Sequence, residues 1–108
     1  MNAKELATSA SSGGNPPAGL TDSVKALWLA RAGRWGEAHD LCQKVEGYEG
    51  AWVHAHLHRV EGDLSNAGYW YEQAGKPQPA GQSMLGEEWL EIAEVLLGEL
   101  EGSPRPSR

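Results

Sequence analysis

Apolar side chains recur every three or four positions in five stretches of this chain, which is the spacing of one face of an α-helix. No stretch alternates apolar and polar residues over the length of a β-strand, so the pattern predicts an all-α fold. The last stretch is long and amphipathic, because a wide apolar band lies opposite a side rich in glutamate. The predicted helices run over about residues 21–32, 35–45, 51–61, 64–74 and 83–101.

A short internal repeat indicates how these helices pair. Residues 33–38, GRWGEA, return 29 positions later as residues 62–67, GDLSNA, and the apolar positions after each copy also correspond. Such an echo is typical of one helical hairpin used twice, because each copy needs a neighbour to bury its apolar face. We therefore expect two hairpins, at about 21–46 and 51–75, closed by the long C-terminal helix at about 83–101.

The second copy has the order of residue types found in helical repeats, with the key positions at Gly62, Leu64, Ala67, Tyr71 and Ala74. This pattern resembles the second half of a tetratricopeptide-type repeat, and the resemblance implies tetratricopeptide-like hairpins. Residues 50–77 also resemble a set of small uncharacterised microbial proteins that share the stretch WVHAxLHRxEGDxxNAxYWYxxAG. This second resemblance implies a helical fold and brings no activity with it.

The two ends of the chain differ in composition from the part between them. Residues 1–19 are rich in Ser, Ala, Gly and Pro, which predicts a disordered N-terminal tail. Residues 20–102 are expected to form a single helical-repeat domain. Residues 103–108 contain two prolines and are predicted to be a frayed C-terminal tail.

The charge distribution argues against two classes of partner. The formal net charge of the 108 residues is −6, and the acidic excess lies between residues 83 and 102. Without a basic stripe or cluster, we expect binding neither to nucleic acid nor to an anionic membrane surface. The single cysteine, Cys42, leaves no internal disulfide framework, and no N-terminal apolar segment indicates secretion. A cytoplasmic location is therefore expected.

Aromatic residues are distributed unusually, with five tryptophans and no phenylalanine. Each predicted helix contains one tryptophan: Trp28, Trp35, Trp52, Trp70 and Trp89. A tryptophan buries a large apolar area and keeps an N–H that needs an acceptor. We therefore expect most of these side chains to be packing anchors between helices.

The helix predicted over 51–61 is rich in histidine and admits two interpretations. His54 and His58 are four positions apart, so they share one side of the helix, and Glu61 follows one turn later on that side. In the first interpretation the helix is packed between neighbours, and both rings are buried and hydrogen-bonded without any cofactor. In the alternative, the two imidazoles point at one divalent transition metal and Glu61 adds an oxygen ligand.

Trp52, His56 and Arg59 share another face of the same helix, and Arg31 lies 28 positions before Arg59. In tetratricopeptide-like units this face lines the concave groove. An exposed tryptophan beside two arginines and a histidine suits a carboxylate or an extended peptide, through cation–π and bidentate contacts. The other interpretation is a solvated face, on which the stem of Arg59 covers Trp52.

The leading function predicted from these patterns is a non-catalytic interaction module that binds a peptide or acidic ligand of an unknown protein partner. The alternative is a small metal- or metabolite-binding protein that uses the histidine-rich helix. Catalysis is not expected, because the polar residues near Glu61 and Asp63 include no evident nucleophile or oxyanion donor. The wide apolar band of the C-terminal helix suggests a homodimer interface, unless it covers both hairpins.

Overall fold

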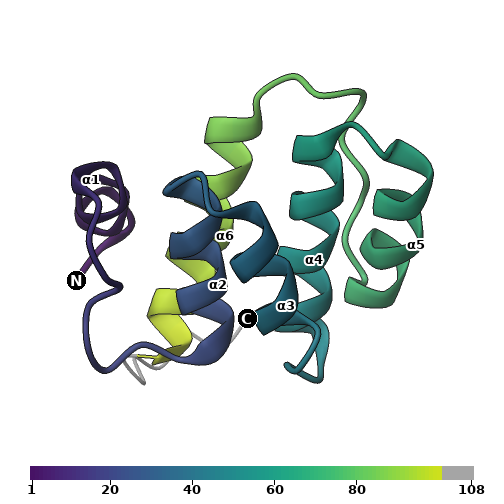
Figure 1. Cartoon of the computed structure of the whole chain (residues 1–108). Helices are drawn as coiled ribbons and strands as arrows, with labels where there is room; N and C mark the ends of the chain where they lie inside the picture. The colour runs from purple at the N-terminus through teal and green to yellow at the C-terminus, as the bar shows by residue number, and fades with distance from the viewer. Residues whose placement is uncertain (101–108) are drawn as a thin grey trace.

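The structure is a computed structural model that describes residues 1–100, and in this part of the chain it contains six α-helices and no strand. The prediction of an all-α fold is confirmed. The frayed tail predicted for residues 103–108 lies outside the described residues. The helices are α1 (Ala3–Ser12), α2 (Asp22–Arg31), α3 (Trp35–Cys42), α4 (Tyr48–Glu61), α5 (Leu64–Ala74) and α6 (Leu85–Leu100) (Figure 1).

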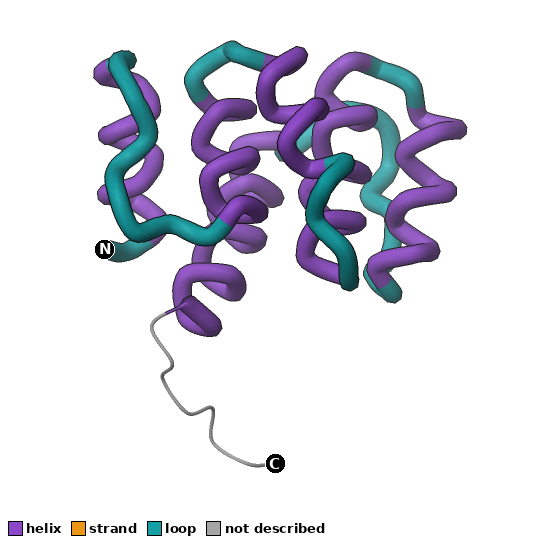
Figure 2. The backbone as a smooth tube through the Cα atoms, turned by 60° about the horizontal axis from the view of Figure 1, so that its bottom comes forward, coloured by secondary structure: helices purple, strands orange, loops and turns teal. Residues whose placement is uncertain are grey.

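Helix α4 lies at the centre of the molecule, in contact with α2, α3, α5 and α6. The two most extensive helix pairs are α4 with α5 and α2 with α3, each formed by helices that follow one another along the chain. Helix α6 then returns to pack against α1, α2 and α4 (Figures 1 and 2). As a result, α1 and α5 lie at opposite ends of the row of helices, and α4 is enclosed between them.

Side-chain and glycine caps set the ends of the predicted helices. The Thr21 hydroxyl accepts from the backbone N–H of Val24 at the start of α2, and the Asp63 carboxylate accepts from Asn66 at the start of α5. Gly62 and Gly75 end α4 and α5 with positive φ angles of 88° and 70°, a conformation that glycine adopts without a Cβ clash. The helix boundaries at these caps therefore follow from the sequence.

The N-terminal segment differs from the expected disordered tail, because Ala3–Ser12 form the helix α1. The Asn2 side chain accepts from the backbone N–H of Glu5, and the Glu5 carboxylate accepts from that of Asn2, each at 2.8 Å. Leu6 is fully buried among three alanines that share its face of α1, and the Trp28 indole of α2 donates to the Ser9 hydroxyl at 3.1 Å. A stripe made mostly of alanine is a weak hydrophobic signal, yet it allows close helix packing.

If this capping box holds α1 in place, Asn2→Ala should lower the free energy of unfolding by about 1 kcal/mol, the usual value of such a cap. Urea unfolding followed by circular dichroism measures the difference. Asn15→Ala changes an exposed asparagine between α1 and α2 and should leave the stability unchanged. Equal stability of the two variants would contradict a folded α1.

The tryptophan side chains connect the helices, as expected for packing anchors. Trp28, Trp52 and Trp89 are buried, whereas Trp35 and Trp70 are half-buried. The Trp89 indole of α6 donates to the Leu27 carbonyl of α2 at 2.8 Å, so it connects the C-terminal helix to α2. The apolar band of α6 is covered within this chain by α1, α2 and α4. A homodimer through this helix stays a prediction. No helix among residues 1–100 is long and apolar enough to cross a membrane.

Candidate metal centre

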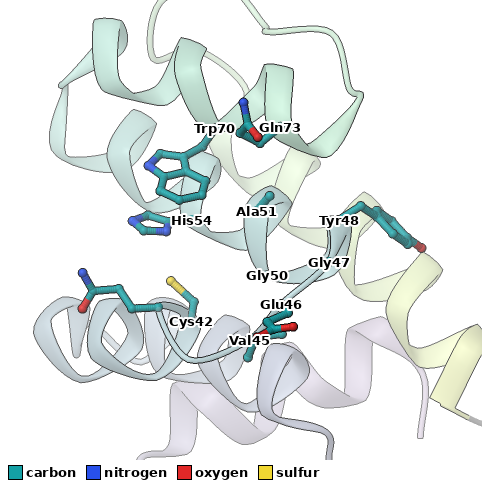
Figure 3. Close-up of a pocket in the computed structure, with 11 residues that line it drawn as sticks. Cys42, Val45, Glu46, Gly47, Tyr48, Gly50, Ala51, His54, Trp70 and Gln73 are labelled. Carbon is teal, nitrogen blue, oxygen red and sulfur yellow. The ribbon is translucent and has the colours of Figure 1, made fainter.

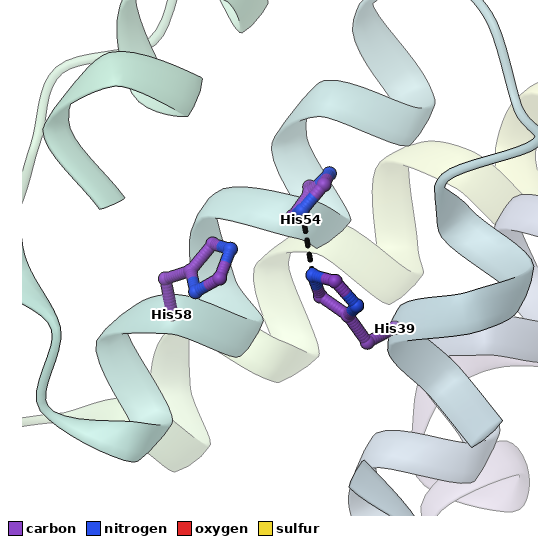
Figure 4. Close-up of side chains that lie close together, drawn as sticks. All are labelled: His39, His54 and His58. Carbon is purple, nitrogen blue, oxygen red and sulfur yellow. Dashed lines mark hydrogen bonds between the residues drawn. The ribbon is translucent and has the colours of Figure 1, made fainter. Parts of the chain in front are cut away.

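Three histidines from two helices form a cluster beside the centre of the molecule. His39 comes from α3, while His54 and His58 come from successive turns of α4 (Figure 4). The Nε2 atoms of His39 and His54 are 3.0 Å apart. One nitrogen from each of the three rings lies within 4.8 Å of the others. Of the four histidines in the chain, only His56 lies outside the cluster.

Local structure explains why these rings meet. His54 and His58 are separated by four positions on α4, so their rings stack at a centroid distance of 4.9 Å. Helix α3 is held against α4 by Trp35, whose indole N–H donates to the Leu57 carbonyl at 2.8 Å. His39 lies one turn after Trp35, and the two rings stack at 4.8 Å with planes only 10° apart. The anchor that packs α3 therefore also orients His39.

A second indole covers the other side of the cluster. Trp70 of α5 stacks on His54 at a centroid distance of 4.0 Å, with an interplanar angle of 13°. His54 and His58 are buried, with exposed fractions of 4% and 5%, and His39 is half-buried. The rings are thus held between Trp35 and Trp70, which limits their rotation.

Glu61 fixes which nitrogen of His58 is available. The Glu61 carboxylate lies 2.8 Å from His58 Nδ1, and an ionised carboxylate can only accept, so Nδ1 donates. In a neutral ring the lone pair is then on Nε2, which faces the Asn66 amide nitrogen at 3.4 Å. A carboxylate behind a histidine in this way is a common arrangement around bound zinc. Glu61, expected as a metal ligand, is placed better to orient His58.

The environment of His39 and His54 favours the neutral form of both rings. Burial, followed by the charges that His39 and His58 would carry, lowers the pKa of His54 from 6.5 to about 4. Burial and then His58 lower the pKa of His39 as well, against the opposing effects of Asp40 and Glu61. At neutral pH these imidazoles therefore retain the lone pairs that hydrogen bonds or a metal ion would use.

A cavity of about 560 Å³ adjoins the cluster and shares His54 with it. It lies between the end of α3, the start of α4 and the C-terminal half of α5 (Figure 3). Trp70 stands over His54 on one side of this space, and Cys42 points into it from α3. Burial raises the pKa of the Cys42 thiol to about 12, so the sulfur is not an ionised ligand at neutral pH.

Of the three cluster residues, His54 and His58 were predicted from the sequence and His39 was not. The i, i+4 spacing on one helix is visible in the sequence, whereas the third ring comes from a different helix. The available signal was the spacing from Trp35 to His39, which places the histidine at the border of the apolar stripe of α3. Trp35 is a packing anchor between α3 and α4, and His39, one turn later, is half-buried beside it.

The residues expected to line an open groove are buried in this structure. Trp52, His56 and Arg59 have exposed fractions of 3%, 3% and 0%. They are covered by α6 and by the segment before it, where the Arg59 Nη1 atom donates to the carbonyls of Gly81 and Ser83. Arg59 can be buried because the carboxylate of Glu88 on α6 faces inward and compensates the charge of its guanidinium.

Glu88 is the centre of this buried polar cluster. Its carboxylate lies 2.6 Å from His56 Nδ1 and 3.3 Å from Arg59 Nε, and it accepts from the Tyr71 hydroxyl. Burial opposes its ionisation, but the hydrogen bonds from His56 and Tyr71 and the charge of Arg59 hold its pKa below the usual value. We therefore assign these four residues to the connection between α4, α5 and α6.

Arg31 is not part of this cluster. Its guanidinium lies over the Trp89 ring, 4.9 Å from the centroid, on the outside of α2 and α6. The described contact of Arg31 is therefore with Trp89 of α6, whereas the histidine cluster brings together residues from two helices. Comparisons of the chain with protein-family models, with curated protein sequences and with solved structures find no match.

Proposed function

We propose that this protein binds a divalent transition metal ion, zinc in the first place, through the Nε2 atoms of His39, His54 and His58. The observation that carries the proposal is the convergence of three imidazoles from two helices with two of their Nε2 atoms only 3.0 Å apart. Imidazole suits zinc and its neighbours in the first transition series, and three histidines with one open position is a known zinc arrangement.

The distances support zinc more closely than a larger ion. With Zn–N bonds of about 2.0–2.1 Å, two nitrogens of one tetrahedral ion lie roughly 3.3 Å apart. The separation between His39 and His54 is already close to this value, and His58, within 4.8 Å of both, needs only a small inward movement. Trp35 and Trp70 restrain the rings close to this geometry. Metal binding therefore costs little side-chain conformational entropy.

The proposal is tested by loading the protein with zinc, dialysing it and measuring the metal per chain. We expect one zinc ion per chain. His39→Gln and His58→Gln should each weaken binding by about 100-fold or more, because each removes one of three ligands. Glu61→Gln should weaken it by about 10–100-fold, because the amide can no longer hold the His58 tautomer as the carboxylate does.

The matched control is His56→Gln, which changes a buried histidine of the same helix that contacts Glu88 and lies outside the cluster. This variant should retain full zinc binding, and circular dichroism establishes whether each variant is folded. Absence of stoichiometric zinc in the folded parent protein would overturn the proposal. Equal zinc loss in folded His56 and His39 variants would contradict the assignment of the ligands to the histidine cluster.

We infer that α2–α3 and α4–α5 are tetratricopeptide-like units, which is supported by the position of the repeat: α3 begins at Trp35 and α5 at Leu64, at the same point of each copy. Peptide binding at Trp52 and Arg59 would first require α6 to separate from α4. Metal binding is therefore the function that the geometry favours.

A further inference from the structure

We propose that the cavity beside His54 is a binding site for a small organic carboxylate whose charged end reaches the metal and whose apolar body fills the cavity. This inference rests on the proposed metal site and specifies what its open position receives. The volume of about 560 Å³ lies within the range of ligand sites, which are concave, mostly apolar and carry a few polar groups.

Position is the first argument. His54 belongs both to the histidine cluster and to the cavity lining, so a ligand in the cavity lies beside the ring that would coordinate the ion. Figure 3 shows Trp70 above His54 and the Cys42 sulfur directed toward the same space. Three histidines leave a tetrahedral ion with one position for a further ligand. The cavity is the space next to the cluster from which such a ligand can approach.

Shape and polarity decide the body of the ligand. Cys42, Val45, Ala51 and Trp70 give the cavity small apolar walls and one large aromatic surface. At the rim, the exposed amide side chains of Gln43 and Gln73 add neutral hydrogen-bonding groups. A planar apolar group fits these walls, since burying it removes apolar surface from water without leaving a charge unpaired.

Charge decides the other end of the ligand. The lining contains no lysine or arginine, and its one ionisable acid is Glu46, so the cavity alone does not favour an anion. Three neutral imidazoles, however, leave the two positive charges of a divalent ion uncompensated by its ligands. A carboxylate is therefore attracted only when the metal is present. We therefore expect the cavity to bind a carboxylate when the metal is present and to bind it poorly when the metal is absent.

The experiment uses the cobalt(II)-loaded full chain, whose visible spectrum reports changes in metal coordination, and benzoate as the probe. Benzoate should shift the cobalt spectrum and bind at least about tenfold more tightly than acetate, which lacks the apolar body. The metal-free protein, followed by tryptophan fluorescence, should bind benzoate at least about tenfold more weakly than the loaded protein. Benzamide, which lacks the charge, should bind both forms weakly and equally.

Two kinds of variant locate the ligand. Ala51→Phe fills the cavity from α4 and should abolish the benzoate shift while cobalt still binds; Ala18→Phe, an exposed position between α1 and α2, should change nothing. Because Ala51 is buried and its replacement can disturb folding, exposed Gln73 provides a second test. Gln73→Glu should weaken benzoate binding about threefold, and Gln73→Lys should strengthen it by a similar factor.

The outcomes separate the two proposals. If cobalt and zinc do not bind, the proposed function fails and the carboxylate site fails with it. If cobalt binds but benzoate leaves its spectrum unchanged at tens of millimolar, only the carboxylate site is overturned. A benzoate shift equal to that of acetate, or one that persists unchanged in the Ala51 and Gln73 variants, would overturn the assignment of the ligand to this cavity.

Discussion

Replacing Glu88 with alanine is expected to lower the free energy of unfolding by about 3–5 kcal/mol, the usual cost of removing one partner from a buried ion pair. Arg59 is fully buried, and Glu88 is the only carboxylate it contacts in the described part of the chain. Its Nη2 atom already lacks a hydrogen-bond partner there. Without Glu88, the buried Arg59 guanidinium loses its counter-charge and the buried Tyr71 hydroxyl loses its acceptor.

Urea unfolding of the parent and the variant measures this loss. Glu91→Ala, an exposed position of the same helix, is the matched control and should change the stability by less than about 0.5 kcal/mol. If Glu88→Ala does not fold, Glu88→Gln keeps the size of the side chain and removes only the charge. A cost below about 1 kcal/mol for Glu88→Ala would contradict a buried ion pair.

Combining Glu88→Gln with Arg59→Met removes both charges at once. The double variant should be more stable than the sum of the two single changes predicts, by about 1–3 kcal/mol, because neither charge is left buried alone. Additive effects would mean that Arg59 and Glu88 act independently.

Acidification should destabilise the metal-free protein through His54. The pKa of this ring is about 4 in the folded state and about 6.5 in the unfolded chain, so between these values the unfolded state binds more protons. The contribution of His54 to the free energy of unfolding is therefore fully present above about pH 6.5, and it is lost as the pH falls toward 4. The loss reaches about 3 kcal/mol at pH 4, and the lowered pKa of His39 adds to it.

Unfolding by urea between pH 4 and pH 8 checks this dependence, with His54→Gln as the comparison. The variant cannot protonate at this position, so the difference in stability between parent and variant should shrink by about 3 kcal/mol from pH 7 to pH 4. The contributions of carboxylates elsewhere, Glu88 included, are the same in both proteins, so they cancel in the difference between parent and variant. A difference that is independent of pH would contradict a buried, neutral His54.

Much of the fold could be predicted from the sequence, because the stripes of α2 to α6 contain large apolar residues at helical spacing. Helix α1 could not be recognised in the same way, since its buried face is mostly alanine, which adds little to a hydrophobic pattern. Its capping residues, Asn2 and Glu5, were the signal available. The packing of α1 against α6 is a tertiary contact between the two ends of the chain, and a local sequence pattern does not predict it.

The buried carboxylate of α6 was missed for a different reason. The glutamates of this helix were expected to form its solvated side, and most of those described are exposed. Glu88, however, lies four positions before Ile92, so it shares the buried face. The spacing therefore predicts that Glu88 lies on the buried face of α6. Its burial depends on the ion pair with Arg59, however, which is 29 positions away along the chain. Likewise, His39 joins His54 only through the pairing of α3 with α4.

Helix α4 is buried along its whole middle, from Gly50 to Arg59. His54 and His58 point toward α3, while His56 and Arg59 point toward α6, so neighbouring residues serve opposite partners. Each residue of an α-helix turns the next by about 100°. Adding or deleting a single residue within α4 would rotate everything beyond that point and misalign both polar groups together. The number of residues in this helix is consequently as strictly constrained as their identity.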